Sequence, residues 1–288
     1  RQKIKSIQTT KKITHAVRLV SMSLYGKLER QETHFAAYLR TVEKAFMQLT
    51  LPVMDTWKHP VIFPEDKLDA NPLIIIAATN KGLCGSLNSN LFRYISIIMN
   101  VGQHQTPSFI AVGARANKFI VEHNIGPVIG FYNDLKAETL SQVTADILEK
   151  IFTAPEPFSS VTLYGNMGKS FFAQAPYHTT LLPLDPQQAT AITEKNDISD
   201  QDDVIWEQPM EEVLEQLARQ YLQSRLVHFL YHTLKAEHAA RFLAMENSTN
   251  NAEKCLEKLT LLFNKTRQAL ITREVAELCA GTSDSASL

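Results

Sequence analysis

Apolar residues near the start of the chain recur at alternating intervals of four and three positions. One series lies within residues 13–24 and a second within residues 35–53. This spacing keeps apolar side chains on one face of an α-helix that packs against another helix. It predicts one helix over residues 1–56, with its apolar face interrupted once near residues 26–31 and its end set by prolines from Pro52 onward. The first series consists of Ile13, Val17, Val20 and Leu24.

A second long helix is predicted for the C-terminal part of the chain. No proline or glycine occurs from Met210 to Ala280, and Gly281 follows as a residue suited to end a helix. At a rise of about 1.5 Å per residue, a helix of about 70 residues is about 100 Å long, which no compact domain can bury. We therefore expect residues 208–282 to pair with residues 1–56 as an antiparallel coiled coil, with its unpaired length projecting outwards.

The middle of the chain has a different pattern. Residues 73–79 form a short, continuous apolar run between a proline and a glycine loop, which is typical of a buried parallel strand. Further short apolar runs alternate with helical stretches, so we expect a Rossmann-like α/β domain over residues 70–190, inserted between the two helices. An acidic linker is expected over residues 185–207. The remaining predicted elements are helix 88–101, strand 108–113, helix 114–122, strand 128–132, helix 138–152, and a hairpin of strands 161–164 and 171–180 that turns at residues 166–168.

Composition indicates a chain that reaches a membrane only through partners. The longest purely apolar run, residues 73–78, is far shorter than the roughly 20 residues that span a bilayer. The three cysteines are widely separated and form no C-x-x-C pair, as expected of reduced thiols. Net charge is −1, but residues 1–30 are strongly basic and residues 193–215 strongly acidic. The basic stretch lacks interleaved aromatic residues, which favours a protein partner over nucleic acid.

The sequence offers few candidates for chemistry. The loop at residues 79–85 follows a strand and precedes a helix, but Gly82 and Gly85 give only G-x-x-G, so we interpret them as a structural turn rather than a nucleotide site. His228 and His232 are spaced to share one helix face, but no third metal ligand accompanies them. No residue places a base beside Cys84. We predict no catalytic residue, no cofactor and no metal site.

Four motifs resemble those of one family, the gamma subunits of F-type ATP synthases. The first is residues 1–16, RQKIKSIQTTKKITHA, which continues to Leu19-Val20-Ser21. The second is residues 81–85, KGLCG, followed by LNSNL at 87–91. The third is AEHAAR at 236–241, and the fourth is NKTRQALIT at 264–272. They follow one another in the order and spacing of that family.

The resemblance implies a non-catalytic rotor shaft. In this family the two terminal helices form an antiparallel coiled coil inside a ring of alternating alpha and beta subunits, and the α/β domain lies against the epsilon subunit and the c-ring. Ion flow turns the c-ring and the shaft, and the shaft drives ATP synthesis or hydrolysis at the beta subunits. The implied location is the cytoplasmic face of a bacterial inner membrane or, alternatively, the matrix side of the mitochondrial inner membrane.

The resemblance also implies contact residues. Arg267, Gln268 and Thr272 match the polar patch that hydrogen-bonds a beta-subunit loop in the family. The basic residues Lys11, Lys12 and Arg18 are expected to face acidic loops of the beta subunits. Two other interpretations stay open on the residues alone. One is a coiled-coil scaffold without a rotor role, and the other is an enzyme that binds a ligand at the Gly82 to Gly85 loop.

Overall fold

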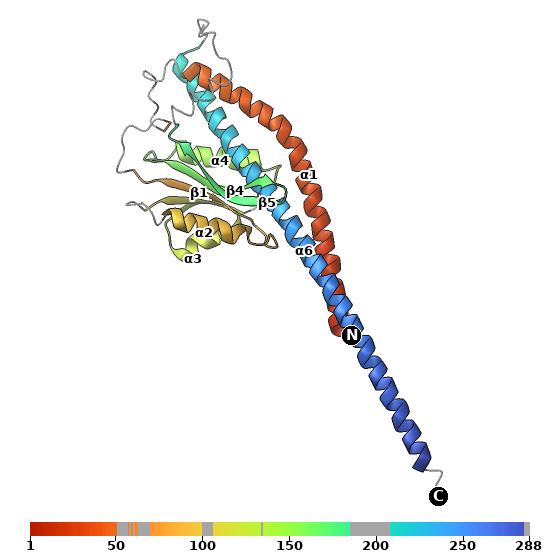
Figure 1. Cartoon of the computed structure of the whole chain (residues 1–288). Helices are drawn as coiled ribbons and strands as arrows, with labels where there is room; N and C mark the ends of the chain where they lie inside the picture. Colours follow the sequence, from red (N-terminus) through yellow and green to blue (C-terminus); the bar gives the residue numbers. More distant parts are fainter. Residues whose placement is uncertain are drawn as a thin grey trace.

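The computed structural model describes residues 1–50, 57, 59, 61–62, 70–99, 106–133, 135–184 and 208–284. Two long helices and one α/β domain make up this part of the chain (Figure 1). The predicted linker at residues 185–207 and the predicted end of the first helix at residues 51–56 lie outside the described residues.

The two long helices run in opposite directions beside each other. Helix α1 spans Gln2–Thr50 and helix α6 spans Met210–Asp284. Lys11 contacts Glu253 near one end of the pair, and Tyr38 contacts Gln220 near the other, so the order of partners is reversed. Helix α6 continues well past the start of α1 (Figure 1).

The predicted helix end at Gly281 is wrong. Helix α6 includes Gly281 and continues to Asp284. A single glycine inside a helix costs only about 1 kcal/mol relative to alanine, which is too little to end a helix by itself.

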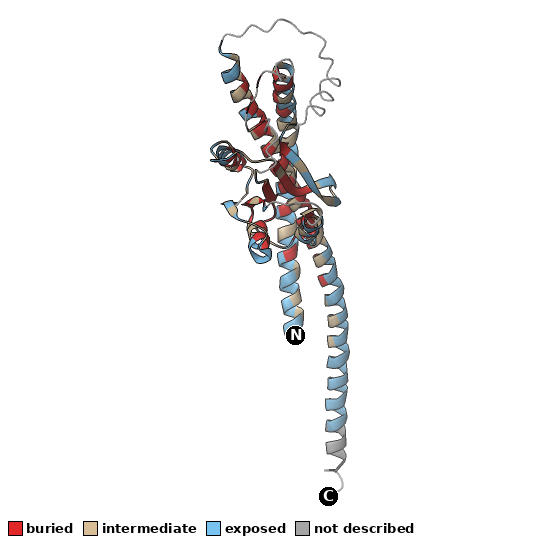
Figure 2. Cartoon of the chain, turned by 90° about the vertical axis from the view of Figure 1, so that its left-hand side faces the viewer, coloured by how far each residue is buried: buried red, intermediate tan, exposed pale blue. Residues whose placement is uncertain are grey.

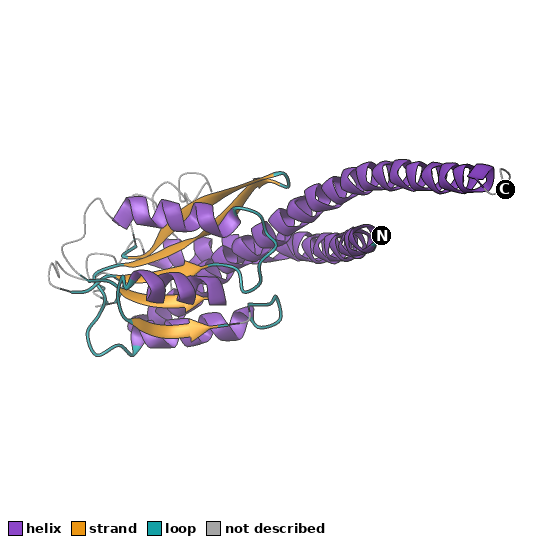
Figure 3. Ribbon diagram, turned by 90° about the horizontal axis from the view of Figure 1, so that it is seen from below, coloured by secondary structure: helices purple, strands orange, loops and turns teal. Residues whose placement is uncertain are grey.

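The α/β domain is one mixed sheet with helices on both faces (Figure 3). Its strand order is β3-β2-β1-β4-β5, in which the first four strands are parallel and β5 is antiparallel to β4. Alternate residues of the central strand β1 belong to two separate cores: Ile74 and Ile76 pack with α2 and α3, whereas Leu73 and Ile75 pack with α4 and α6. The elements are β1 Leu73–Ala77, α2 Leu87–Met99, β2 Ser108–Val112, α3 Ala114–His123, β3 Val128–Tyr132, α4 Leu140–Phe152, β4 Val161–Ser170 and β5 Ala173–Leu182.

The hairpin turns later than predicted. Residues 166–168 lie inside β4, and the chain reverses at Phe171 and Phe172, between β4 and β5. Glycine occurs at 165 because β4 presses against α6 there: a Cβ on Gly165 would lie 2.5 Å from Thr233 Oγ1. Gly165 therefore serves close packing of a strand on a helix, and the glycine-containing stretch does not form a turn.

The predicted apolar seam at the start of α1 is also wrong. Ile13, Val20 and Leu24 are 56%, 58% and 40% exposed. Over residues 14–25 the residues that face α6 lie one position after the predicted series, whereas over residues 35–46 they are those of the second predicted series, and the three-and-four spacing continues without interruption between the two. Each of their side chains is buried or half-buried. They are Lys11, Thr14, Arg18, Ser21, Tyr25, Leu28, Glu32, Phe35, Leu39, Val42 and Phe46.

Candidate functional site: the helix pair and its projecting end

The part of the α1–α6 interface that is nearest the N-terminus is held by polar contacts. Lys11 Nζ lies 2.6 Å from Glu253 Oε1, and Arg18 forms an ion pair with Glu246. Between them, Thr249 Oγ1 donates a hydrogen bond of 2.8 Å to Thr14 Oγ1, in a site where both threonines are buried. Small and polar residues thus occupy positions that usually carry large apolar side chains in paired helices.

An ion-pair network lies at the middle of the interface. Lys235 Nζ donates to Glu32, lies 3.7 Å from Glu29 Oε1, and lies 5.5 Å from the centre of the Tyr25 ring. Burial alone would lower the pKa of Lys235, but the hydrogen bond and the charge of Glu32 raise it above its ordinary value. The side chains of Lys235 and Glu32 are each 19% exposed, so water screens this pair only in part.

The two histidines predicted to share a helix face do so, as partners of each other. His228 Nε2 and His232 Nε2 lie 3.0 Å apart, and His232 Nδ1 lies 3.4 Å from Glu32 Oε1. One ring must donate and the other accept, which requires the accepting ring to be neutral. Burial first, and His232 second, lower the pKa of His228 to about 4. The described residues include no group of three or more potential metal ligands.

The glycine loop packs against α6. Arg241, which also pairs with Glu237, donates from Nε to Gly82 O over 3.4 Å. Gly85 has a φ of +60°, in the region that favours glycine, but the other residue of the loop with positive φ is Leu83 (φ +66°) and not Gly82. Burial raises the pKa of the Cys84 thiol, which opposes formation of a nucleophilic thiolate.

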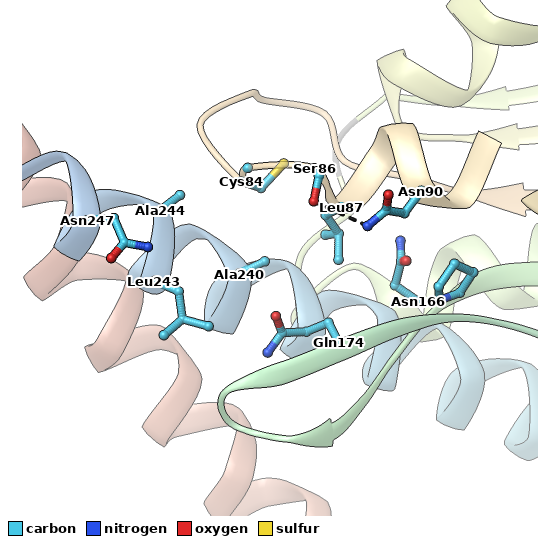
Figure 4. A pocket seen from close by; sticks show the side chains of 12 residues that line it. Cys84, Ser86, Leu87, Asn90, Asn166, Gln174, Ala240, Leu243, Ala244 and Asn247 are labelled. Carbon is cyan, nitrogen blue, oxygen red and sulfur yellow. Dashed lines mark hydrogen bonds between the residues drawn. The ribbon is translucent and has the colours of Figure 1, made fainter. Parts of the chain in front are cut away.

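A small cavity of about 200 Å³ is lined by this loop, the β4–β5 hairpin and α6 (Figure 4). No charged side chain lines it, so nothing there would neutralise the phosphates of a nucleotide. Its polar lining consists mainly of carboxamides and one hydroxyl. The labelled residues are Cys84, Ser86, Leu87, Asn90, Asn166, Gln174, Ala240, Leu243, Ala244 and Asn247.

Helix α6 projects beyond the start of α1 as an exposed single helix (Figure 2). Arg1 lies 5.5 Å from the centre of the Phe263 ring, and residues 264–277 are all exposed. Large apolar side chains are exposed here as well: Leu270 is 54%, Ile271 51% and Val275 53% exposed. A helix with such residues in water marks a surface for a partner.

Three of the predicted contact residues lie on this projecting end. Arg267, Gln268 and Thr272 are exposed, and Thr272 Oγ1 donates only to Gln268 O, at 2.9 Å. Gln268 and Thr272 are four positions apart and therefore share one face of α6. Their side chains are available to a partner.

The other three predicted contact residues are separate from this group. Lys11 pairs with Glu253, about 20 Å along α6 from Arg267 at about 1.5 Å per residue. Lys11 and Arg18 use their charges within the α1–α6 interface. Lys12 is exposed and has no ion-pair partner in the described part of the chain. Sequence reasoning missed the intrachain role of Lys11 and Arg18, because their partners lie more than 200 residues away.

Comparison with known proteins identifies the family of this chain. The family model described as ATP synthase matches residues 1–284. A gamma chain of ATP synthase from Francisella tularensis subsp. novicida is 30% identical over 294 residues, which cover 98% of this chain and 97% of the relative. The chain belongs to the ATP synthase gamma family.

Other relatives agree. A gamma chain from Bdellovibrio bacteriovorus is 27% identical over 287 residues, with 98% of this chain and 96% of the relative covered. A solved central stalk and c-ring of the Tetrahymena thermophila mitochondrial ATP synthase has the same fold, with a TM-score of 0.59 at 17% identity over 82% of this chain and 98% of that chain. A Euglena gracilis mitochondrial ATP synthase structure matches with a TM-score of 0.57 at 18% identity, over 93% and 94% of the two chains.

Membership in the gamma family fits the geometry. The chain is a non-catalytic shaft of the rotor in an ATP synthase, and the beta subunits carry out catalysis. In the described residues, no helix is both long and apolar enough to cross a membrane.

Proposed function

We propose that α1 and α6 form an antiparallel coiled coil that turns inside a ring of alternating alpha and beta subunits. The unbroken three-and-four seam of α1 supports this proposal, because that repeat lets two helices stay in register over a long distance. The predicted divisions at residues 1–56, 70–190 and 208–282 belong to the same proposal: a shaft of two helices and an inserted α/β domain.

The observation that carries the proposal is the projecting end of α6. From Phe263 to Asp284 the helix extends by about 30 Å at about 1.5 Å per residue, and over residues 264–277 its apolar and polar side chains are all exposed. Such a segment is unstable in water without a partner. A closely fitting hole in a ring of subunits would cover it.

The partners follow from this placement. The projecting end and Lys12 would face the beta subunits, whereas the α/β domain would lie outside the ring, on the epsilon subunit and the c-ring. Bacterial relatives support a place on the cytoplasmic face of the bacterial inner membrane, with the matrix side of the mitochondrial inner membrane as the alternative. The shaft would couple proton or sodium flow through the c-ring to ATP synthesis or hydrolysis.

Substitution on the projecting end tests the proposed contact. The double variant Arg267→Ala/Gln268→Ala removes two hydrogen-bonding side chains toward a beta subunit. At about 1 kcal/mol each, their loss lowers the maximal rate of ATP hydrolysis by the assembled alpha, beta and gamma subunits by about 30-fold. Thr272→Ala gives a smaller loss in the same direction.

Arg273→Ala is the matched control. Arg273 is an exposed arginine on the same helix, but its Nε pairs with Glu277 Oε1 at 2.7 Å. This variant keeps the wild-type rate. A double variant that assembles and hydrolyses ATP at the wild-type rate would show that Arg267 and Gln268 are merely solvated.

A further inference from the structure

The tip of the β4–β5 hairpin reaches both long helices. The Phe171 ring lies 4.8 Å from the Tyr25 ring of α1, at an interplanar angle of 80°, and 5.2 Å from the Phe242 ring of α6, at 60°. These are edge-to-face contacts, the favourable geometry for aromatic pairs. Tyr25 is only 7% exposed, so the contact is inside the molecule. One side chain of the α/β domain thus joins α1 to α6.

The base of the same hairpin is fixed to α6 at a second point. A Cβ on Gly165 would lie 2.5 Å from Thr233 Oγ1 and 2.8 Å from Phe229 Cζ, which shows that the strand backbone lies directly on the helix. From Gly165 to Phe171 the strand extends about 20 Å at about 3.3 Å per residue. The hairpin is therefore attached to α6 at two separate levels.

A third attachment holds α6 from another side. Ala240 packs with Cys84 and Leu87 of the glycine loop, whereas Phe242 packs with Phe171. Residues two positions apart on a helix are separated by about 200° around its axis. At this level the α/β domain contacts α6 on nearly opposite sides, and the hairpin lies on the side that faces α1. The hairpin passes beside α6 at the level of Gln174 (Figure 4).

We propose that Phe171 transmits turning force between the α/β domain and the helix pair. A twist about the α6 axis is resisted best by contacts that lie off the axis and are far apart. Phe171, which is half-buried, supplies an aromatic contact that includes α1. A second link from α1 to the domain, between Lys27 and Glu138 at 2.9 Å, is an exposed ion pair and is weak. Phe171 is thus a positioning residue for coupling, and this role rests on the proposed rotor function.

The hairpin tip offers its own control. Phe172 is the adjacent residue of the same type, but it is 76% exposed and its described ring contact is with Phe171. Phe171→Ala removes the aromatic ring that contacts both helices, and Phe172→Ala removes a ring of equal size that is largely exposed. Phe171→Tyr keeps the ring edges and should keep the wild-type number of ions pumped per ATP hydrolysed.

The test uses the whole ATP synthase, assembled with its own subunits in lipid vesicles. ATP-driven ion pumping is measured against ATP hydrolysis, and hydrolysis is also measured in the detached assembly of alpha, beta and gamma subunits. Phe171→Ala lowers the number of ions pumped per ATP hydrolysed and leaves hydrolysis by the detached assembly unchanged. Phe172→Ala and Phe171→Tyr keep the wild-type ratio. A role in folding alone would reduce both activities together, in proportion to the amount assembled.

An unchanged pumping ratio in an assembled Phe171→Ala enzyme overturns the proposal. If that variant does not assemble, Phe171→Leu is measured instead, because leucine fills the site without the ring edges. The proposal then requires that the leucine variant pump fewer ions per ATP hydrolysed than the wild type. A ratio equal to the wild-type value in the leucine variant is the contradicting result. Failure of the wild-type enzyme itself to pump would refute the proposed rotor function, and so is distinct from failure of this inference.

Discussion

Acid should destabilise the helix pair through His238. This residue lies on α6, and its side chain lines a cavity of about 580 Å³ between α1 and the α/β domain, together with Ser21 and Leu24. Its Nδ1 atom is buried and has no hydrogen-bond partner in the described part of the chain. Burial first, and the charge of Arg241 second, lower the pKa of His238 to about 4 from its ordinary value of 6.5. The folded state therefore holds this ring neutral.

Proton binding at His238 sets the direction and the size of the change in the free energy of unfolding with pH. Between pH 6.5 and about pH 4, the unfolded chain binds a proton at His238 that the folded chain does not bind. The free energy of unfolding therefore falls as the pH falls through this window. The loss from this one group is about 2 kcal/mol at about pH 5, and it levels off at about 3 kcal/mol below about pH 4.

Urea denaturation followed by circular dichroism measures this effect in the isolated chain. The free energy of unfolding is determined for the wild type and for His238→Gln at about pH 7.5 and about pH 5. The variant should lose about 2 kcal/mol less than the wild type between the two pH values. His34→Gln, at an exposed position of α1, should lose as much as the wild type. Equal losses in His238→Gln and the wild type would refute the reasoning.

Two further substitutions test the packing. Lys235→Met leaves the half-buried Glu32 carboxylate without its lysine partner, which should lower the free energy of unfolding by about 1–3 kcal/mol in urea denaturation. A double variant with Glu32→Leu should recover part of that loss, and a double variant no more stable than Lys235→Met would contradict this interpretation. Gly165→Ala places a methyl group against Thr233 and should cost about 1–3 kcal/mol in the same assay. Gly26→Ala, with nothing within 4 Å of the added Cβ, should instead stabilise α1 by up to about 1 kcal/mol, so equal effects of the two alanines would argue against the close contact at Gly165.

The α/β domain could be predicted closely because its strands are short apolar runs between strong breakers. Strand β3 has the predicted bounds, and β1 and β2 end within two residues of theirs. The hairpin turn could not be placed in this way. Asn166-Met167-Gly168 has the composition of a turn, but these residues continue β4, and the preceding Gly165 lets the strand lie directly on α6. Only the position of α6 distinguishes the two uses.

The helix pair shows the opposite case. Its existence follows from the three-and-four repeat, but its true seam runs through polar residues such as Arg18 and Glu32. Periodicity reasoning follows apolar side chains and therefore selects the neighbouring stripe, which includes Val20. The signal for the true seam was the opposite charge on α6, at Glu246 and Lys235, which can be paired only when the register of the two helices is known.

The contact residues were predicted from family resemblance and not from the pattern of apolar positions. Arg267, Gln268 and Thr272 were predicted from resemblance alone, because exposed polar residues on a helix do not differ in pattern from any solvated face. The structure adds that they lie on the part of α6 that no other described element covers (Figure 2). Their contact with a beta subunit stays a prediction.

Rotation is the most direct test of the central claim. The chain is assembled with its own alpha and beta subunits, the ring is fixed to a surface, and a probe is attached to a cysteine introduced on the α/β domain. If the chain is the rotor shaft, the probe turns in one direction when ATP is added and stops when ATP is removed. An assembly that hydrolyses ATP while the probe stays still would contradict the shaft function and favour a static scaffold.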